Sequence, residues 1–205
     1  MPPLPMFPLG TVLFPSAVLP LHVFEPRYRA LVRDCLAGER ELGVVLIERG
    51  SEVGGGDVRS DVGTVAHIVE AQELPDGRWA LITVGARRLR VQAWLPDAPY
   101  PLADVVDWPD PAPGPDHEEQ AALALARLRR VLALAAEAGE GTAPATVELS
   151  DDLVLAVQQA AAVAPLGPFD RQRLLAAPAP EERARLLDEL LGEAEEVLTL
   201  RLGGA

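Results

Sequence analysis

Hydrophobic residues in the first half of the chain form short runs that are rich in β-branched residues and are separated by turn signals. Runs of this length and composition predict strands rather than helices. The segment Pro75-Asp76-Gly77 between two of the runs predicts a tight hairpin, and Gly54-Gly55-Gly56 predicts a mobile loop. The predicted strands are Val18–Phe24, Leu42–Ile47, Val62–Val69, Trp79–Val84, Leu89–Leu95 and Leu102–Val106.

One helix is predicted among these strands, from Pro26 at its first position to just before Gly38. Apolar residues recur at helical spacing within it, so one of its faces should pack on the sheet. Those residues are Tyr28, Leu31, Val32, Cys35 and Leu36. We therefore expect Cys35 to be buried and unreactive. We also expect Glu25, just before the helix, to cap it or to pair with a neighbouring arginine.

The apolar period becomes helical after a proline-rich stretch, Trp108–Pro115, which can continue neither a helix nor a central strand and which we interpret as a linker. Asp116, with Glu119 three residues later, predicts a capping box at the start of a helix that ends near Ala138. Further helices are predicted to begin after Ser150, near Asp170 and at Pro180.

The two halves also differ in composition, because 15 of the 20 prolines lie at or before Pro115 and 21 alanines lie after it. We interpret the chain as an α+β protein with a β-rich domain at 1–110 and a helical domain at 116–205. The buried stripe predicted for the first long helix is Ala121, Leu125, Leu128, Leu132 and Ala135. The one predicted for the last helix is Leu186, Leu187, Leu190, Leu191, Ala194, Val197 and Leu198.

The charge balance narrows the range of partners. With 18 basic and 31 acidic residues in 205, the net charge is −13, which disfavours binding to nucleic acids and to anionic membranes. No lysine occurs, so P-loop phosphate binding, Schiff-base chemistry and Ser-Lys dyads are excluded. A single cysteine forms no internal disulfide, and no apolar stretch is long enough to span a bilayer. We expect a cytoplasmic protein without a membrane partner.

Residues that could carry catalysis or hold a metal are few and scattered. The four serines lie outside Gly-x-Ser-x-Gly elbows, and the histidines His22, His67 and His117 have no second ligand at helical spacing. We interpret His22 and His67 as partly buried strand residues. The sequence therefore predicts neither an enzyme nor a metal site, and it indicates no cofactor.

A basic cluster, Arg87-Arg88-Leu89-Arg90, is a weak signal for an anion or RNA site, because the nearby aromatic residues are only Trp79 and Trp94. Arginines at a strand end that serve solubility or ion pairing are the interpretation that we favour.

Several segments share their residues and order with a known family. The segment Leu4–Val32 contains Phe-Pro-Leu, Leu-Phe-Pro, Pro-Leu and Phe-Glu-Pro-Arg-Tyr in sequence. With Gly63–Ala66, the Pro75 hairpin, Gly85–Val91 and Tyr100–Val106, it resembles the N-terminal substrate-binding domain of the Lon protease family. The segments Asp170–Ala176 and Glu182–Leu187 resemble that family's helical subdomain, so the resemblance covers nearly the whole chain.

The resemblance implies a β-rich, PUA-like lobe followed by a helical bundle, and a role in recognising polypeptides destined for degradation. A Lon protease continues into ATPase and Ser-Lys peptidase domains. We expect neither activity here, because both active sites need a lysine and these 205 residues contain none. We therefore expect a stand-alone, non-catalytic protein that binds unfolded or extended polypeptides as an adaptor or holdase in protein quality control, with a protease or chaperone as a further partner. The candidate peptide-binding residues are Phe7, Phe14, Leu19 and Phe24. An RNA- or nucleotide-binding PUA-like module is the alternative.

Overall fold

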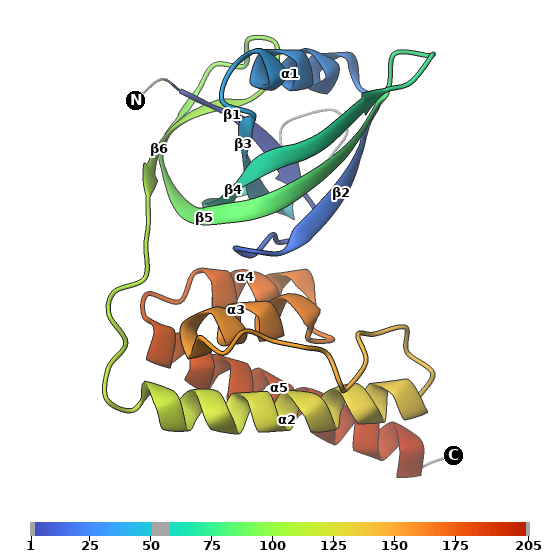
Figure 1. The fold of residues 1–205 in the computed structure, drawn as a ribbon, viewed down its shortest axis with the longest axis vertical. Helices are drawn as coiled ribbons and strands as arrows, with labels where there is room; N and C mark the ends of the chain where they lie inside the picture. The colour runs from blue at the N-terminus through green and yellow to red at the C-terminus, as the bar shows by residue number, and fades with distance from the viewer. Residues whose placement is uncertain (1–2, 51–57, 204–205) are drawn as a thin grey trace. The chain divides into compact units, whose positions relative to one another are not determined.

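The computed structural model describes residues 3–50 and 58–203, and the chain divides into two compact units. The first unit is Met1–Pro109, and the second is Asp110–Ala205. A sheet and one helix make up the described part of the first unit, whereas helices and loops make up that of the second (Figure 1). The predicted α+β fold class, with the β-rich part before the helical part, is confirmed. The predicted loop at Gly54-Gly55-Gly56 lies outside the described residues.

The sheet of the first unit closes on itself. Its strand order is β2 (Val18–Val23), β5 (Trp79–Leu95), β4 (Val58–Glu73), β3 (Glu41–Arg49), β1 (Leu4–Leu9) and β6 (Leu102–Asp107). Because β6 also pairs with the second half of β5, the strands from β5 to β6 form a barrel, and β2 is added to the first half of β5. Closure leaves few free strand edges, which protects the sheet against aggregation.

Strand β1 is absent from the sequence-based prediction, because Pro5 and Pro8 lack the N–H groups that a central strand needs. The structure accommodates both prolines. β1 pairs in parallel with β3 from Met6 to Leu9, but it meets β6 only at Leu4 and Pro5. A strand with one continuous neighbour loses few ladder hydrogen bonds to proline.

The predicted strands Trp79–Val84 and Leu89–Leu95 are two halves of the single strand β5. Its pairing with β4 shifts by one residue at Ala86, and such a bulge bends a strand without ending it. Gly85 is required beside the bulge, because a Cβ atom there would collide with the carbonyl oxygen of Phe14. The polar interruption in the sequence therefore marks a bend of the barrel.

Helix α1 (Pro26–Ala37) lies over one end of the barrel (Figure 1) and buries Tyr28, Leu31, Val32 and Cys35, as predicted. These side chains join residues of the strands in the larger core cluster of the unit. A second cluster, around Met6 and Leu89, fills the rest of the barrel. Burial of a large apolar side chain stabilises a fold by about 1.5–3 kcal/mol, so α1 is an integral part of the barrel.

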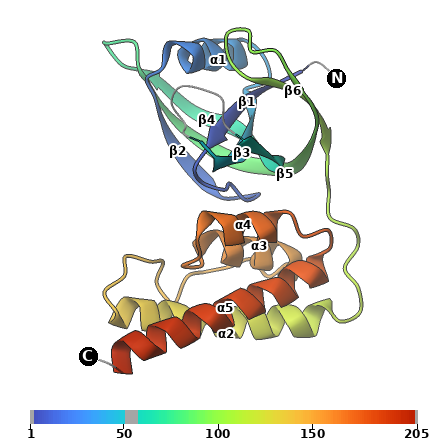
Figure 2. The same cartoon turned by 180° about the vertical axis from the view of Figure 1, so that it is seen from behind.

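The second unit is built on α2 (His117–Glu137) and α5 (Pro180–Gly203), which run side by side. Helices α3 (Leu153–Val163) and α4 (Pro168–Leu175) pack on this pair (Figure 2). The core consists of small and branched apolar residues that are fully buried, such as Ala124, Leu128 and Leu187. The alanine-rich composition of this half therefore allows close approach of the helices.

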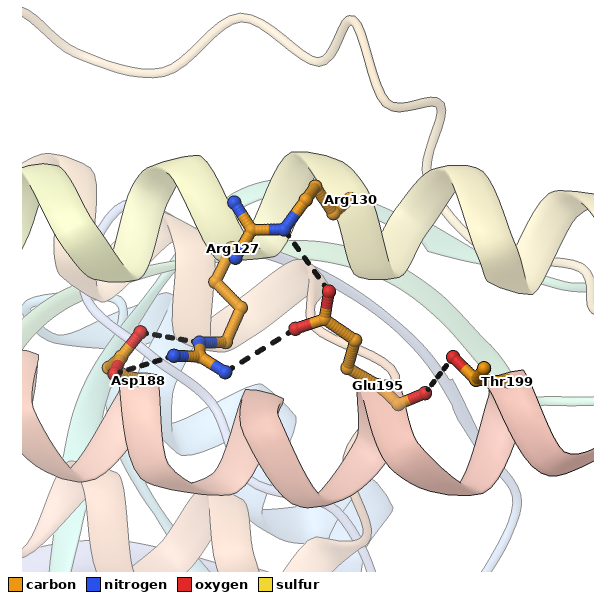
Figure 3. Close-up of polar contacts among 5 residues, drawn as sticks. All are labelled: Arg127, Arg130, Asp188, Glu195 and Thr199. Atoms are coloured by element: carbon orange, nitrogen blue, oxygen red, sulfur yellow. Dashed lines mark hydrogen bonds and ion pairs between the residues drawn. The ribbon is translucent and has the colours of Figure 1, made fainter.

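Polar contacts border the α2–α5 interface (Figure 3). The Arg127 guanidinium donates to the Asp188 carboxylate at 2.7 Å and lies 3.3 Å from Glu195, which also pairs with Arg130 at 3.1 Å. The Thr199 hydroxyl donates to the backbone carbonyl of Glu195. Because these side chains are partly exposed, each pair contributes only a few tenths of a kcal/mol to stability, and apolar packing dominates.

The predicted capping box at Asp116 and the predicted burial of Val197 are wrong, and Leu125 is only partly buried. Asp116 has helical backbone angles (φ −88°, ψ −2°) and makes no capping hydrogen bond with its side chain, because capping needs an extended residue at that position. Asp152 is extended and does cap α3, accepting from the N–H groups of Val154 and Leu155. Val197 is 49% exposed, since the neighbouring Leu198 occupies the buried stripe of α5 and Val197 points about 100° away from it.

The proline-rich segment is anchored at Asp110. Its carboxylate accepts hydrogen bonds from both terminal nitrogens of Arg183 at 2.8 and 2.9 Å, and from the Gln158 side-chain amide at 2.8 Å. Arg183 also donates to the backbone carbonyls of Leu174 and Ala177. The Arg183 side chain is 1% exposed, so this is a buried, hydrogen-bonded ion pair within the second unit.

Candidate functional site

An apolar pocket of about 190 Å³ lies beside β2 and the start of α1 in the first unit. Its lining residues come from β1, from β2, from the turn into α1 and from α1 itself. They are Phe7, Leu9, Pro20, Leu21, His22, Val23, Phe24, Glu25 and Tyr28. Pockets for drug-sized ligands usually measure about 300–1,000 Å³, so this one suits a single large side chain better than a whole ligand.

Aromatic rings form one wall of the pocket. The Phe7 and Tyr28 rings are stacked, with centroids 4.2 Å apart and planes at 18°. The Arg27 guanidinium lies 4.5 Å from the Tyr28 ring centre, and its Nε is 3.0 Å from a carboxylate oxygen of Glu25. Glu25 thus pairs with an arginine and does not cap α1 with its side chain. Because the charge of Glu25 is compensated, the pocket favours an apolar group.

The structure separates the four residues predicted to bind peptides. Phe7 and Phe24 line the pocket together; Phe7 is buried in its wall, whereas Phe24 is 58% exposed at its rim. Phe14 is 1% exposed and belongs to the core, and Leu19 is partly buried against that core. A partner can therefore reach Phe24 directly, and Phe7 only through the pocket.

Leu9 and Tyr28 also line the pocket but are not among the predicted site residues. The helical spacing of Tyr28 predicts that it faces the sheet, which it does, but spacing alone does not show that a pocket opens there. Leu9 belongs to β1, the strand that is not predicted from the sequence because it contains two prolines. Neither residue carries a motif by which it could have been found.

The arginine cluster is engaged in contacts within the first unit. Arg87 makes a two-pronged ion pair with Glu41, at 2.7 and 2.8 Å, and contacts Asp107 at 2.8 Å; these bonds raise the pKa of Arg87. Arg88 and Arg90 lie 4.2 and 4.0 Å from the Trp108 ring centre, and Arg88 is 3% exposed. Arg87 therefore fits the ion-pairing interpretation of the cluster, whereas Arg88 and Arg90 pack against an aromatic ring.

Two of the three histidines lie in strands, as predicted, but are less buried than predicted. His22 and His67 are exposed, because they lie on the outward face of their strands, whereas His117 is 3% exposed at the start of α2. Neither ring nitrogen of His117 has a hydrogen-bond partner within the described residues. In residues 3–50 and 58–203, no group of His, Cys, Asp and Glu side chains is arranged to hold a metal ion.

Cys35 is buried, as predicted, and its Sγ donates a hydrogen bond to the backbone carbonyl of Glu41 at 3.2 Å. Burial, with a smaller contribution from the charge of Asp34, raises the pKa of the Cys35 thiol to about 12. A thiol in this state is a poor nucleophile. Among the helices of the described residues, none combines the length and apolar character required to cross a bilayer.

Comparison with known proteins identifies the family. The model of the ATP-dependent protease La (LON) substrate-binding domain matches residues 3–193, so the chain belongs to the Lon substrate-binding domain family, and the resemblance found in the sequence is confirmed. Lon protease 2 of Herpetosiphon aurantiacus is 32% identical over 201 residues, which are 96% of this chain and 24% of that protein. Lon protease 2 of Myxococcus xanthus is 36% identical over 100 residues, 47% of this chain and 12% of that protein.

Solved structures show the same fold. The Lon N-terminal domain protein from Xanthomonas campestris is 28% identical and superposes with a TM-score of 0.62, covering 94% of this chain and 98% of that one. The N-terminal domain of Mycobacterium avium complex Lon protease superposes with a TM-score of 0.65 at 20% identity, covering 93% and 98%. The chain therefore spans the N-terminal domains it matches, but only about a quarter of the Herpetosiphon protease.

Proposed function

We propose that this protein binds unfolded or extended polypeptides at the pocket beside β2, without catalysis of its own, and that it serves as an adaptor or holdase. The observation that carries the proposal is the match of residues 3–193 to a substrate-binding domain, joined to an apolar pocket whose rim exposes Phe24. Exposed apolar surface beside a pocket is typical of sites that bind other proteins.

The site favours apolar recognition. Glu25 is paired with Arg27, and the pocket wall is the stacked pair of Phe7 and Tyr28. Apolar contacts are little weakened by salt, whereas exposed ion pairs are screened within about 10 Å at 0.1 M salt. We therefore expect the protein to retain a reduced, unfolded model protein equally well at low and at high salt, and not to retain the same protein in its folded form.

The matched variants are Phe24→Asp and Phe169→Asp. Both phenylalanines are 58% exposed, but Phe169 belongs to α4 of the other unit and is not one of the residues that line the pocket. Because aromatic anchors often contribute more than 1.4 kcal/mol to binding, Phe24→Asp should weaken affinity at least about tenfold, and Phe169→Asp should leave it within twofold of the original. Both variants should keep their thermal midpoint.

Three results would contradict this function. One is that no unfolded protein is retained at any salt concentration. Another is that structured RNA is bound in its place, which would favour the RNA-binding alternative. The third is that the two variants lose affinity equally, which would show that the pocket is not the binding site.

A further inference from the structure

Strand β2 is the open edge of the sheet, and the orientation of its backbone groups follows from its pairing. The Gly85 N–H donates to the Ala17 carbonyl at 2.9 Å, and the next residue pair is Val18 with Val84. In an antiparallel ladder this makes Val18–Val84 a non-hydrogen-bonded pair, so the N–H and C=O groups of Val18 point away from β5. Because hydrogen-bonded and non-hydrogen-bonded pairs alternate along the ladder, the backbone groups of Pro20 and His22 also point away from β5.

These outward groups have no hydrogen-bond partner among the residues that the structure describes, where β2 pairs with β5 alone. The edge offers N–H donors at Val18 and His22, and C=O acceptors at Val18, Pro20 and His22. Pro20 lacks an N–H, and proline is one of the devices that keep a free edge from aggregating. The edge is therefore partly blocked but still able to form hydrogen bonds with an extended chain.

The pocket adjoins this edge, because Pro20 and His22 belong to the edge and also line the pocket. On the basis of the function proposed above, we propose that a bound polypeptide adds a strand to the outer edge of β2 and places one apolar side chain in the pocket. The occupant is an extended segment that contains one large apolar residue and lacks proline. Backbone hydrogen bonds would give affinity without reading sequence, and the pocket of about 190 Å³ would select the single side chain.

Amide hydrogen exchange tests this mode directly. The probe is a synthetic peptide with one central phenylalanine between alternating serine and threonine residues. In the free protein, the Val18 and His22 amide protons should exchange rapidly, and in saturating peptide they should exchange at least about tenfold more slowly. Insertion of the side chain into the pocket without strand addition would leave both exchange rates unchanged.

N-methylated peptides provide the matched control on the ligand. Strand addition directs every second peptide N–H toward β2, and the single phenylalanine fixes which ones. Methylation of one alternating set of N–H groups should abolish binding, whereas methylation of the other set, with the same composition, should be tolerated. Equal effects of the two sets would overturn strand addition.

Pro20→Ala is the corresponding variant of the protein. It adds one outward donor, and one hydrogen bond commonly changes affinity about threefold to tenfold. We expect tighter binding of the peptide by that factor, and no change for Pro113→Ala, an exposed proline of the other unit. Unchanged affinity for Pro20→Ala would count against the proposal.

The outcomes separate this inference from the proposed function. If the unmodified peptide and unfolded proteins both fail to bind, the proposed function is wrong, and strand addition falls with it. If they bind but Val18 and His22 gain no protection, only strand addition is wrong. If the protein is a dimer in which both amides are already protected without peptide, a second copy occupies the edge and the proposal is overturned.

Discussion

Removal of the Asp110 carboxylate should strongly destabilise the second unit. Arg183, with a side chain only 1% exposed, would keep its charge and lose both hydrogen bonds to Asp110. A buried charge left without its partner costs about 3–5 kcal/mol, and a whole domain is stable by only about 5–15 kcal/mol. We therefore expect Asp110→Ala to lower the free energy of unfolding of this unit by about 3 kcal/mol or more.

Urea unfolding followed by circular dichroism at a helix-sensitive wavelength measures this loss, because the second unit contains most of the helix. With a slope of about 1.5 kcal/mol per M, a loss of 3 kcal/mol moves the midpoint by about 2 M. Glu189→Ala, which removes an exposed ion pair with Arg185 at 3.7 Å, should shift the free energy by less than about 0.5 kcal/mol.

A double variant separates the cost of the unpaired charge from that of lost packing. Asp110→Ala combined with Arg183→Met removes both charges and should recover about half of the lost stability, since apolar replacements of buried pairs are often nearly neutral. Full recovery is not expected, because Arg183 also serves the carbonyls of Leu174 and Ala177. A midpoint for Asp110→Ala equal to that of Glu189→Ala would refute the buried ion pair.

Three further predictions concern the reactivity of Cys35, the folding of the second unit on its own and the absence of catalysis. The pKa of Cys35 is raised from 9.0 to about 12. At pH 8 its thiolate should therefore be about a thousandfold scarcer in the folded protein than in the unfolded one. Iodoacetamide should label Cys35 only after denaturation. A fragment of residues 110–205 should fold to a cooperative helical unit. A fragment of residues 116–205, which lacks Asp110, should melt at a lower temperature. Equal melting temperatures of the two fragments would contradict the anchoring role of Asp110. Purified protein should hydrolyse neither ATP nor casein, and activity that persists through repurification would contradict a non-catalytic role.

The sequence predicts the elements best where local signals agree with the three-dimensional environment. Pro26 and Gly38 frame α1, and the spacing of its apolar residues gives its buried face. Prediction fails where pairing between distant residues decides the structure. The prolines of β1 are acceptable only because β1 has one continuous neighbour, and the interruption in β5 is a bulge against β4.

The candidate site shows the same distinction. Phe7 and Phe24 are recognisable as apolar residues, but their meeting at one pocket depends on the crossing of β1, β2 and α1. Phe14 has the same residue type and a similar sequence context, yet Gly85 packs against its carbonyl and its ring is buried. The ion pair of Asp110 with Arg183 joins residues 73 positions apart, which no local pattern reveals.

Site-specific cross-linking tests polypeptide binding at the pocket most directly. A photoreactive p-benzoylphenylalanine would replace Phe24 in one variant and the equally exposed Phe169 in another. On illumination with a reduced, unfolded model protein, we expect strong cross-linking from position 24, little from position 169, and loss of the product in an excess of the phenylalanine peptide. Equal cross-linking from both positions, or none from position 24, would contradict binding at this pocket.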